Sequence, residues 1–199
     1  MKIRNIFKHF GKICKHKTWV FYYCCRAGIP WRGIKHDMSK FSPIEFWESV
    51  KYYQGDRSPI DACKEANGVS KAWMHHKGRN RHHYEYWQDN FDKGGESVQM
   101  PKKEAIELIC DYLGAGRAYM GKKFSYKAEY EWWLKKIEKP IAMHPQTKIF
   151  VTAVMQNLAD AEQRLKKNFI LSYNFYNGWL NFLYDEAVKE YKNGSSYLC

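Results

Sequence analysis

The sequence predicts an all-α fold, and three observations lead to this prediction. Apolar residues recur at helical spacing through most of the chain, serine-proline pairs mark helix starts, and no pattern typical of a β-hairpin or a βαβ unit is present. With 199 residues, 45% of them hydrophobic and 17% aromatic, the chain can form one domain with a real core. We expect a core over residues 1–125, with C-terminal helices over residues 126–199 packed on it.

Glycine, proline and serine divide the first half of the chain into helices. Gly28 and Pro30 end the first helix, and Gly78 ends a later one. Ser42-Pro43 and Ser58-Pro59 each place a capping serine before a proline, which predicts a helix start. The helices expected here cover residues 3–26 and 31–41, begin at residues 43 and 59, and cover residues 70–77 and 81–89.

The second half begins with an expected loop over residues 90–99, which contains two adjacent glycines. Pro101 then opens a helix that is apolar along much of its length and runs toward Gly121. Two further helices are expected over residues 126–138 and 147–166. Residues 168–192 are rich in aromatic side chains and predict a last helix, which is compatible with a lid, a dimer surface or ordinary packing.

Charge and cysteine content limit the partners and the compartment. The net charge is +12 and the pI is about 9.3, which favours polyanions, although lysine-rich helix faces are often merely solvated. The sequence has no C-x-x-C pair, no signal peptide and no apolar run long enough to span a bilayer. We therefore expect a cytoplasmic protein without a membrane partner, and we leave its oligomeric state open, homo-oligomers included. The cysteines expected to be reduced are Cys14, Cys24, Cys25, Cys63, Cys110 and Cys199.

Histidines gather in a way that predicts a metal site. Five of the eight lie in two short blocks, KHDMSKFSP and WMHHKGRNRHHYEYW. Imidazole and carboxylate groups are the ligands that Zn, Mn and Fe prefer. Burying so many imidazoles without such a role would leave many donors and acceptors to satisfy. His9 and His144 lie outside these blocks, and we interpret them as ordinary core or surface residues.

Two more residues are expected to face the core near these blocks. His16 shares a helical face with Ile13 and Val20. Asp111 lies within apolar helix sequence, where an unpaired carboxylate would be costly, so it needs a metal or a cationic partner. Glu107, one turn earlier on the same face, is the rival candidate, and a plain ion pair with Arg or Lys is the alternative to a metal.

These residues resemble the HD-domain superfamily of metal-dependent phosphohydrolases, whose common H-D-x-x-K form is similar to HDMSK at residues 36–40. More closely, the blocks H-D-M-S-K-F-S-P-x-E-F and H-H-K-G-R-N-R-H-H-Y-E-Y-W resemble a domain family of unknown function from bacteria and their phages, over about residues 12–125. The resemblance implies an HD-like bundle with two metal ions bridged by Asp37. The first ion would be held by His16, His36, Asp37 and Asp111, and the second by Asp37, His76 and either His82 or His83.

The same resemblance implies a phosphohydrolase in which a metal-activated water attacks phosphorus, with Asp37 and Lys40 as catalytic residues. Trp73, Tyr84, Tyr86 and Trp87 are candidates to stack on a base or, for at least half of them, to pack in the core. Asn80 would orient a ligand or cap a helix. The substrate-binding candidates are Lys40, Lys77, Arg79, Asn80 and His75.

The implied substrate is a nucleotide or a nucleotide-derived signal, cyclic forms included. The implied cofactor is a pair of divalent transition-metal ions, drawn from Mn, Fe, Zn, Ni and Co. Two other hypotheses stay open. One is a di-iron oxygenase with the same ligands. The other is a non-enzymatic protein that binds nucleic acid or sequesters a nucleotide, for which the occurrence of the similar family in phages implies a counter-defence role.

Overall fold

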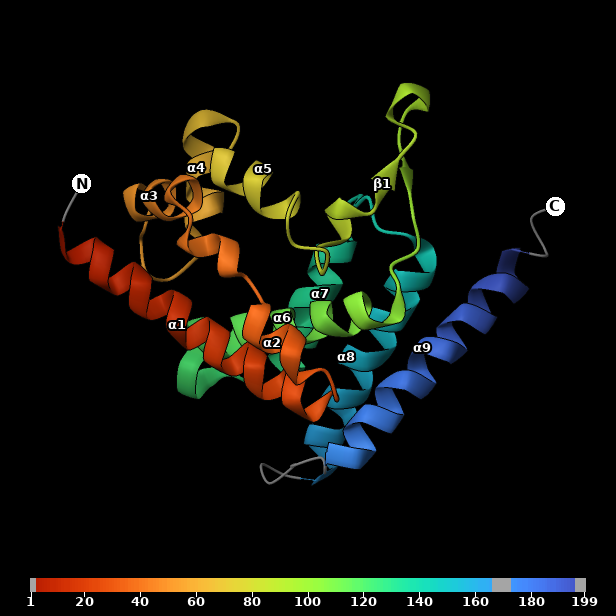
Figure 1. Ribbon diagram of the computed structural model, residues 1–199. Coiled ribbons are helices and arrows are strands. Elements are labelled where there is room, and N and C mark those ends of the chain that lie inside the picture. The colour runs from red at the N-terminus through yellow and green to blue at the C-terminus, as the bar shows by residue number, and fades with distance from the viewer. Residues whose placement is uncertain (1–2, 166–172, 196–199) are drawn as a thin grey trace.

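The computed structural model describes residues 3–165 and 173–195, and within them it confirms the all-α prediction (Figure 1). Short 3-10 helices lie at Met38–Phe41, Tyr84–Tyr86, Phe91–Lys93 and Gly121–Lys123. The α-helices are α1 (Ile3–Arg26), α2 (Pro30–Lys35), α3 (Pro43–Lys51), α4 (Pro59–Asn67), α5 (Lys71–Lys77), α6 (Lys102–Met120), α7 (Tyr126–Ile137), α8 (Pro145–Leu165) and α9 (Tyr173–Ser195).

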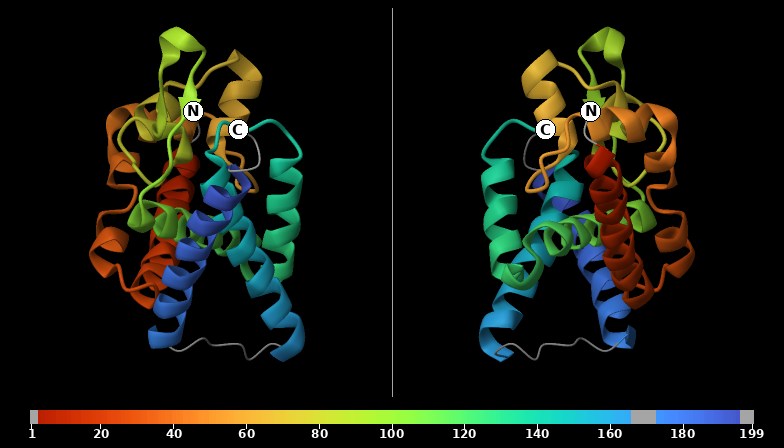
Figure 2. Two further views of the ribbon diagram at one scale, coloured as in Figure 1. Left: turned by 90° about the vertical axis from the view of Figure 1, so that its right-hand side faces the viewer. Right: turned by 90° about the vertical axis from the view of Figure 1, so that its left-hand side faces the viewer.

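Helix α6 forms the centre of the molecule. Every residue from Glu104 to Gly114 is buried, as expected of a helix covered on all sides. Helix α1 packs along one side of α6, while α7, α8 and α9 cover other sides (Figures 1 and 2). Gly114 permits the close approach of α1, because a Cβ at this position would lie 2.5 Å from Cγ2 of Val20. The ligand-rich face of α6 is thereby held against α1.

Serine caps begin four of the helices, and two of them were predicted from Ser-Pro pairs. The side-chain oxygen of Ser42 accepts a hydrogen bond from the backbone of Glu45, and that of Ser58 accepts one from Ile60. Ser70 and Ser125 cap α5 and α7 in the same way. The cap at Ser42 fixes the start of α3 and so the position of Glu45, which points toward the histidines.

The prediction of one helix over residues 31–41 was wrong in its middle. Helix α2 ends at Lys35, and a separate 3-10 turn begins at Met38. Asp37, between them, adopts φ 54° and ψ 27°, a left-handed conformation that is uncommon for residues other than glycine. Such backbone strain persists only where surrounding structure holds it, and it is concentrated at functional sites. The break rotates Asp37 inward, where a continuous helix would direct it differently.

The helix predicted over residues 81–89 was also wrong, and a small β-hairpin follows that no sequence pattern indicated. Turns carry the chain from Gly78 to His83, and only Tyr84–Tyr86 forms a 3-10 turn. Strands β1 (Gln88–Asp89) and β2 (Glu96–Ser97) then pair antiparallel, with Gln88 opposite Ser97. This small hairpin projects from the helical body (Figure 1). Two residues per strand are too few to show the alternating pattern that identifies a hairpin in a sequence.

The C-terminal helices follow the predicted order. Helices α7 and α8 pack against each other, and α9 packs on α8 and contacts α1 and α6. Buried aromatic side chains such as Tyr176 and Tyr184 join α9 to the main core. Residues 168–172 of the predicted last helix lie outside the described residues, and the division at residue 125 stays a prediction. Among the helices described, none combines the length and the apolar character that crossing a membrane requires.

The cysteines of the described residues are free, in keeping with the predicted reduced state. Cys24, Cys63 and Cys110 are buried, whereas Cys14 and Cys25 are partly buried. Cys199 lies outside the described residues.

Candidate metal centre

The carboxylate of Asp37 lies at the centre of the histidine cluster. Its Oδ2 atom is 3.4 Å from Nε2 of His16 and 3.3 Å from Nε2 of His36. Its Oδ1 atom is 3.2 Å from Nε2 of His76 and 3.4 Å from Nε2 of His82. One fully buried carboxylate therefore faces two separate pairs of imidazoles, one pair with each oxygen. This is the arrangement expected of a ligand shared by two metal ions.

Asp111 closes the first group. Its Oδ1 atom lies 3.1 Å from Nε2 of His16 and 3.2 Å from Nε2 of His36. Together with Asp37, these residues offer four ligand atoms within 4.8 Å of one another. Helix α1 supplies His16, the break after α2 supplies His36 and Asp37, and α6 supplies Asp111, so the group depends on the α1–α6 packing.

The second group consists of Asp37, His76, His82 and His83, whose ligand atoms again lie within 4.8 Å of one another. The sequence left the choice between His82 and His83 open, because neighbouring side chains on a helix diverge by about 100° and only one of them would then reach the group. The chain is not helical here, and the two rings lie 4.3 Å apart between centroids, so both reach the group.

Several buried atoms of these groups lack the partners that buried polar atoms require. Oδ1 of Asp37 and the Nε2 atoms of His82 and His83 have no hydrogen-bond partner among the described residues, and Oδ2 of Asp37 has an ion pair with Lys40 in place of a hydrogen bond. Leaving such atoms buried and unsatisfied is unfavourable unless a ligand meets them. Imidazole nitrogens and a carboxylate that converge in this way suit a divalent transition metal, so the donor set fits such an ion.

The electrostatic environment keeps the two carboxylates ionised and His83 neutral, whereas neighbouring carboxylates raise the pKa values of His36 and His76 despite burial. Burial acts to raise the pKa of Asp37, but the positive charges of His36, Lys40 and His76 bring that pKa well below its usual value. The pKa of the Asp111 carboxyl is also lowered well below normal, because hydrogen bonds from His16 and His36 outweigh burial. Burial and neighbouring His82 lower the pKa of His83, which keeps that imidazole neutral. Ionised carboxylates and neutral imidazoles are the forms that bind metals, so metal binding would require His36 and His76 to release a proton.

Glu107 lies on the Nδ1 side of the histidines, and with His36 and His82 it forms a third group whose ligand atoms lie within 4.8 Å of one another. Its Oε1 atom is 3.0 Å from Nδ1 of His36 and 3.2 Å from Nδ1 of His82. Its other oxygen is 2.6 Å from Nε of Arg32. Burial acts to raise the pKa of Glu107, but its hydrogen bonds with His36 and His82 lower that pKa to about 2. Glu107 thus orients one histidine of each group, so that Nε2 faces Asp37.

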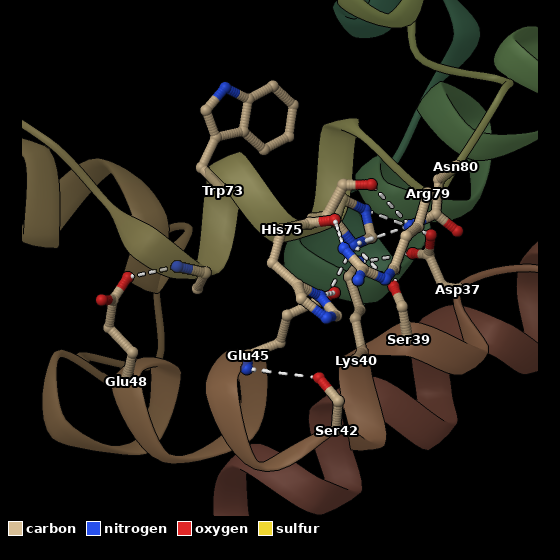
Figure 3. A network of polar contacts seen from close by, with 12 residues as sticks. Asp37, Ser39, Lys40, Ser42, Glu45, Glu48, Trp73, His75, Arg79 and Asn80 are labelled. Carbon is tan, nitrogen blue, oxygen red and sulfur yellow. Dashed lines mark hydrogen bonds and ion pairs between the residues drawn. The ribbon is translucent and has the colours of Figure 1, made fainter.

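Glu45 has the same relationship to the first His-His pair. Its two oxygens lie 2.6 Å from Nδ1 of His75 and 2.7 Å from Nδ1 of His76 (Figure 3). His76 continues to Asp37 through Nε2, whereas His75 has no contact with Asp37. Of this pair, His76 alone belongs to the predicted ligand groups, and His75 holds the Glu45 carboxylate in place through Nδ1.

A cavity of about 210 Å³ opens onto both groups. His16 and Asp111 of the first group line it, as do His76 and His83 of the second. Lys40 also lines the cavity, and its ammonium nitrogen lies 2.5 Å from Oδ2 of Asp37. Nearby carboxylates raise the pKa of Lys40 despite burial, so it stays positively charged. The cavity can therefore present an anion to the groups that would hold the metal.

His9 and Lys12 line this cavity and were not identified as site residues from the sequence. His9 is buried, its Nδ1 atom has no hydrogen-bond partner, and burial together with the charge of Lys40 lowers its pKa to about 4. Lys12 lies with its ammonium nitrogen 4.6 Å from the ring centre of Tyr119. His9 and Lys12 precede His16 by seven and four residues on α1, so the helical spacing that identified His16 also contained the signal for them.

The remaining substrate-binding candidates lie elsewhere. Arg79 and Asn80 line a different pocket, on the Nδ1 side of His36 and His82, and Lys77 lines neither. The side-chain amide of Asn80 donates hydrogen bonds to the backbone carbonyl of His76 and to the hydroxyl of Ser39 (Figure 3). These bonds stabilise the turn after α5. Among the aromatic candidates, Trp73 lines the cavity, Tyr84 is buried in the core, and Tyr86 and Trp87 lie beside Arg81.

Comparison with known proteins gives a family and no function. No curated protein and no solved structure matches the chain. The profile of one family, described as a family of unknown function (DUF5662), matches residues 5–157. The matched segment contains every residue of both ligand groups and both supporting glutamates, and it extends past residue 125 into α8. The resemblance to an uncharacterised domain is thus confirmed, whereas the resemblance to HD domains stays a prediction, and the chain belongs to the DUF5662 family.

Proposed function

We propose that this protein is a metal-dependent phosphohydrolase that holds two divalent ions on either side of Asp37. The observation that carries the proposal is the division of one buried carboxylate between two groups of imidazoles, each with its own access to the same cavity. His16, His36 and Asp111 would complete one site, and His76, His82 and His83 the other. A bound pair of ions would polarise a phosphoryl oxygen and lower the pKa of a water molecule.

The side chains of the cavity support an anionic substrate. Lys40 is positively charged next to Asp37, and Lys12 provides a second ammonium group on the same wall. These groups would bind the non-reacting oxygens of a phosphate and offset the charge that accumulates during in-line attack. His9 is neutral and offers a buried ring nitrogen as a further hydrogen-bonding group.

The cavity limits the size of what is enclosed. Its volume of about 210 Å³ is below the roughly 300–1,000 Å³ typical of pockets for drug-sized ligands. Its other walls are largely apolar, and they include Ile13, Ile60 and Trp73. We therefore propose that the phosphoryl group and one adjoining small group enter the cavity. If the substrate is a nucleotide, its base would remain at the mouth.

The deciding experiment combines elemental analysis with an activity assay. We expect wild-type protein to contain about two transition-metal ions per chain and to hydrolyse p-nitrophenyl phosphate, and we expect Asp37→Ala to lose both properties. Asp92→Ala is the matched control, because Asp92 is an exposed aspartate on the hairpin. Two ions without phosphatase or phosphodiesterase activity, in an iron-loaded protein that consumes oxygen, would replace the hydrolase by the oxygenase. Equal metal content in Asp37→Ala and wild type would refute the shared site.

A further inference from the structure

We infer that a second pocket, on the far side of the histidines from the cavity, binds the phosphate groups of a ligand other than the substrate. This pocket has a volume of about 320 Å³ and shares no lining residue with the central cavity. Helix α2 provides Arg32 and Lys35, and the turn after α5 provides Arg79 and Arg81. Four cationic side chains from two segments distant in sequence therefore converge on one concavity.

The carboxylates nearby do not balance these cations. Arg32 faces Glu107 at 2.6 Å and Glu104 at 3.3 Å, and Arg81 lies 3.8 Å from the same Glu104. Neither Lys35 nor Arg79 forms an ion pair with any carboxylate of the described residues; the guanidinium of Arg79 contacts only a backbone carbonyl, that of His75. The pocket thus has an excess of about two positive charges that the protein does not neutralise.

The chemistry of the lining points to phosphate. Planar guanidinium groups bind phosphate oxygens in pairs, and a concave arrangement of several such groups is better suited to an anion than separate lysines on a solvated helix face. Trp31 also lines the pocket and is 75% exposed, which leaves its ring free to stack on a base. The ligand class is therefore a phosphate anhydride such as pyrophosphate, alone or as part of a nucleoside diphosphate.

The pocket lies on the opposite side of His36 and His82 from the two metal sites proposed around Asp37, and it contains Glu107, which forms a third candidate ligand group with those two histidines. His36 and His82 form part of its wall, but both rings direct Nδ1 toward Glu107 on this side and Nε2 toward Asp37 on the other. A ligand in this pocket would meet Arg32 and Glu107 and would not reach the atoms that face Asp37. The inference therefore does not depend on the proposed hydrolase activity, and Arg79 and Asn80 belong to this pocket.

Calorimetric titration of the full chain as purified tests the inference. Pyrophosphate is the first probe, and the test variant is Lys35→Ala with Arg79→Ala, two exposed residues that make no ion pair. We expect the double variant to bind pyrophosphate at least about tenfold more weakly than wild type, which corresponds to 1.4 kcal/mol. Lys135→Ala removes an exposed lysine that lines neither pocket, and it should leave the affinity unchanged.

A second probe identifies the source of the phosphate groups. ADP that binds more tightly than pyrophosphate, with the gain lost in Trp31→Ala, would identify a nucleoside diphosphate; equal affinities would identify the anhydride alone. Both results support the site. The inference is overturned if wild type does not bind pyrophosphate at millimolar concentration, or if the double variant binds it as well as Lys135→Ala. Binding that survives the double variant but is lost in Lys40→Ala would assign the anion to the central cavity and would also overturn it.

Discussion

The ammonium nitrogen of Lys40 lies 2.5 Å from Oδ2 of Asp37, three residues earlier in the chain. The 3-10 turn that follows Asp37 brings Lys40, three residues later, next to the Asp37 carboxylate, and Lys40 also lines the cavity. Lys40 is thus placed where it can contact a bound anion without being one of the groups that would hold a metal.

Replacing Lys40 with methionine should lower kcat/KM for p-nitrophenyl phosphate by about 100-fold, because a charge that stabilises the transition state is removed from a site of low polarity. Metal content should not change. Elemental analysis and steady-state kinetics on the same preparation separate these effects. Lys40→Arg should recover part of the activity, and Lys135→Met should behave as wild type. A loss of metal in Lys40→Met would instead indicate a structural role.

Replacing Glu107 with glutamine should weaken metal binding by about 10- to 100-fold, because His36 and His82 lose the carboxylate that orients them. Competition with a metal chelator measures this effect. Glu104→Gln is the matched control: Glu104 is a buried glutamate on the same helix that pairs with Arg32 and touches neither histidine. Equal losses in both variants would show that the arginine contacts, and not the histidine contacts, matter.

Adjacent residues His75 and His76 should differ sharply. His76→Ala removes a side chain that faces Oδ1 of Asp37 and should reduce metal content from about two ions to about one. His75→Ala removes only a partner of Glu45 and should retain both ions. Elemental analysis of the two variants, purified side by side, provides the comparison. A similar loss in both would mean that the pair acts as a unit through Glu45.

Stability should fall as the pH rises from about 4.5 to about 7, because of Glu129 on α7. Burial raises the pKa of this glutamate from 4.5 to about 7. A raised pKa in the folded state means that the folded protein binds the proton more tightly than the unfolded chain, so the contribution to stability is present below about 4.5 and is lost between 4.5 and 7. The loss amounts to at most about 3 kcal/mol.

Glu129→Gln should therefore be more stable than wild type at pH 8, with the difference shrinking toward pH 5, as followed by thermal unfolding. Glu131→Gln, an exposed glutamate on the same helix, should show no such trend. The buried carboxylate of Glu129 packs against Gly116. A side chain at position 116 would leave no room for it, because a Cβ there would lie 1.8 Å from Oε1 of Glu129. A constant difference between Glu129→Gln and wild type at all pH values would contradict the raised pKa.

Helical periodicity and capping serines were enough to predict the order of the helices and the inward direction of His16 and Asp111. They could not predict the breaks at Asp37 and at residues 78–83, because a left-handed aspartate and a turn with two inward histidines depend on contacts with α1, α3 and α6 that are distant in sequence. The choice between Asp111 and Glu107 required the orientation of the His36 ring, whose two nitrogens face different carboxylates.

The ligands of the first group extend from residue 16 to residue 111, with α6 supplying the last of them. During synthesis, a ribosome must therefore release the chain through Asp111, in the middle of α6, before this group can close. An ion bound only by the completed group adds its binding free energy to folding at that late step, and shorter nascent chains gain nothing from it. If the proposed ion binds this group, starving cells of it should reduce the accumulation of folded protein.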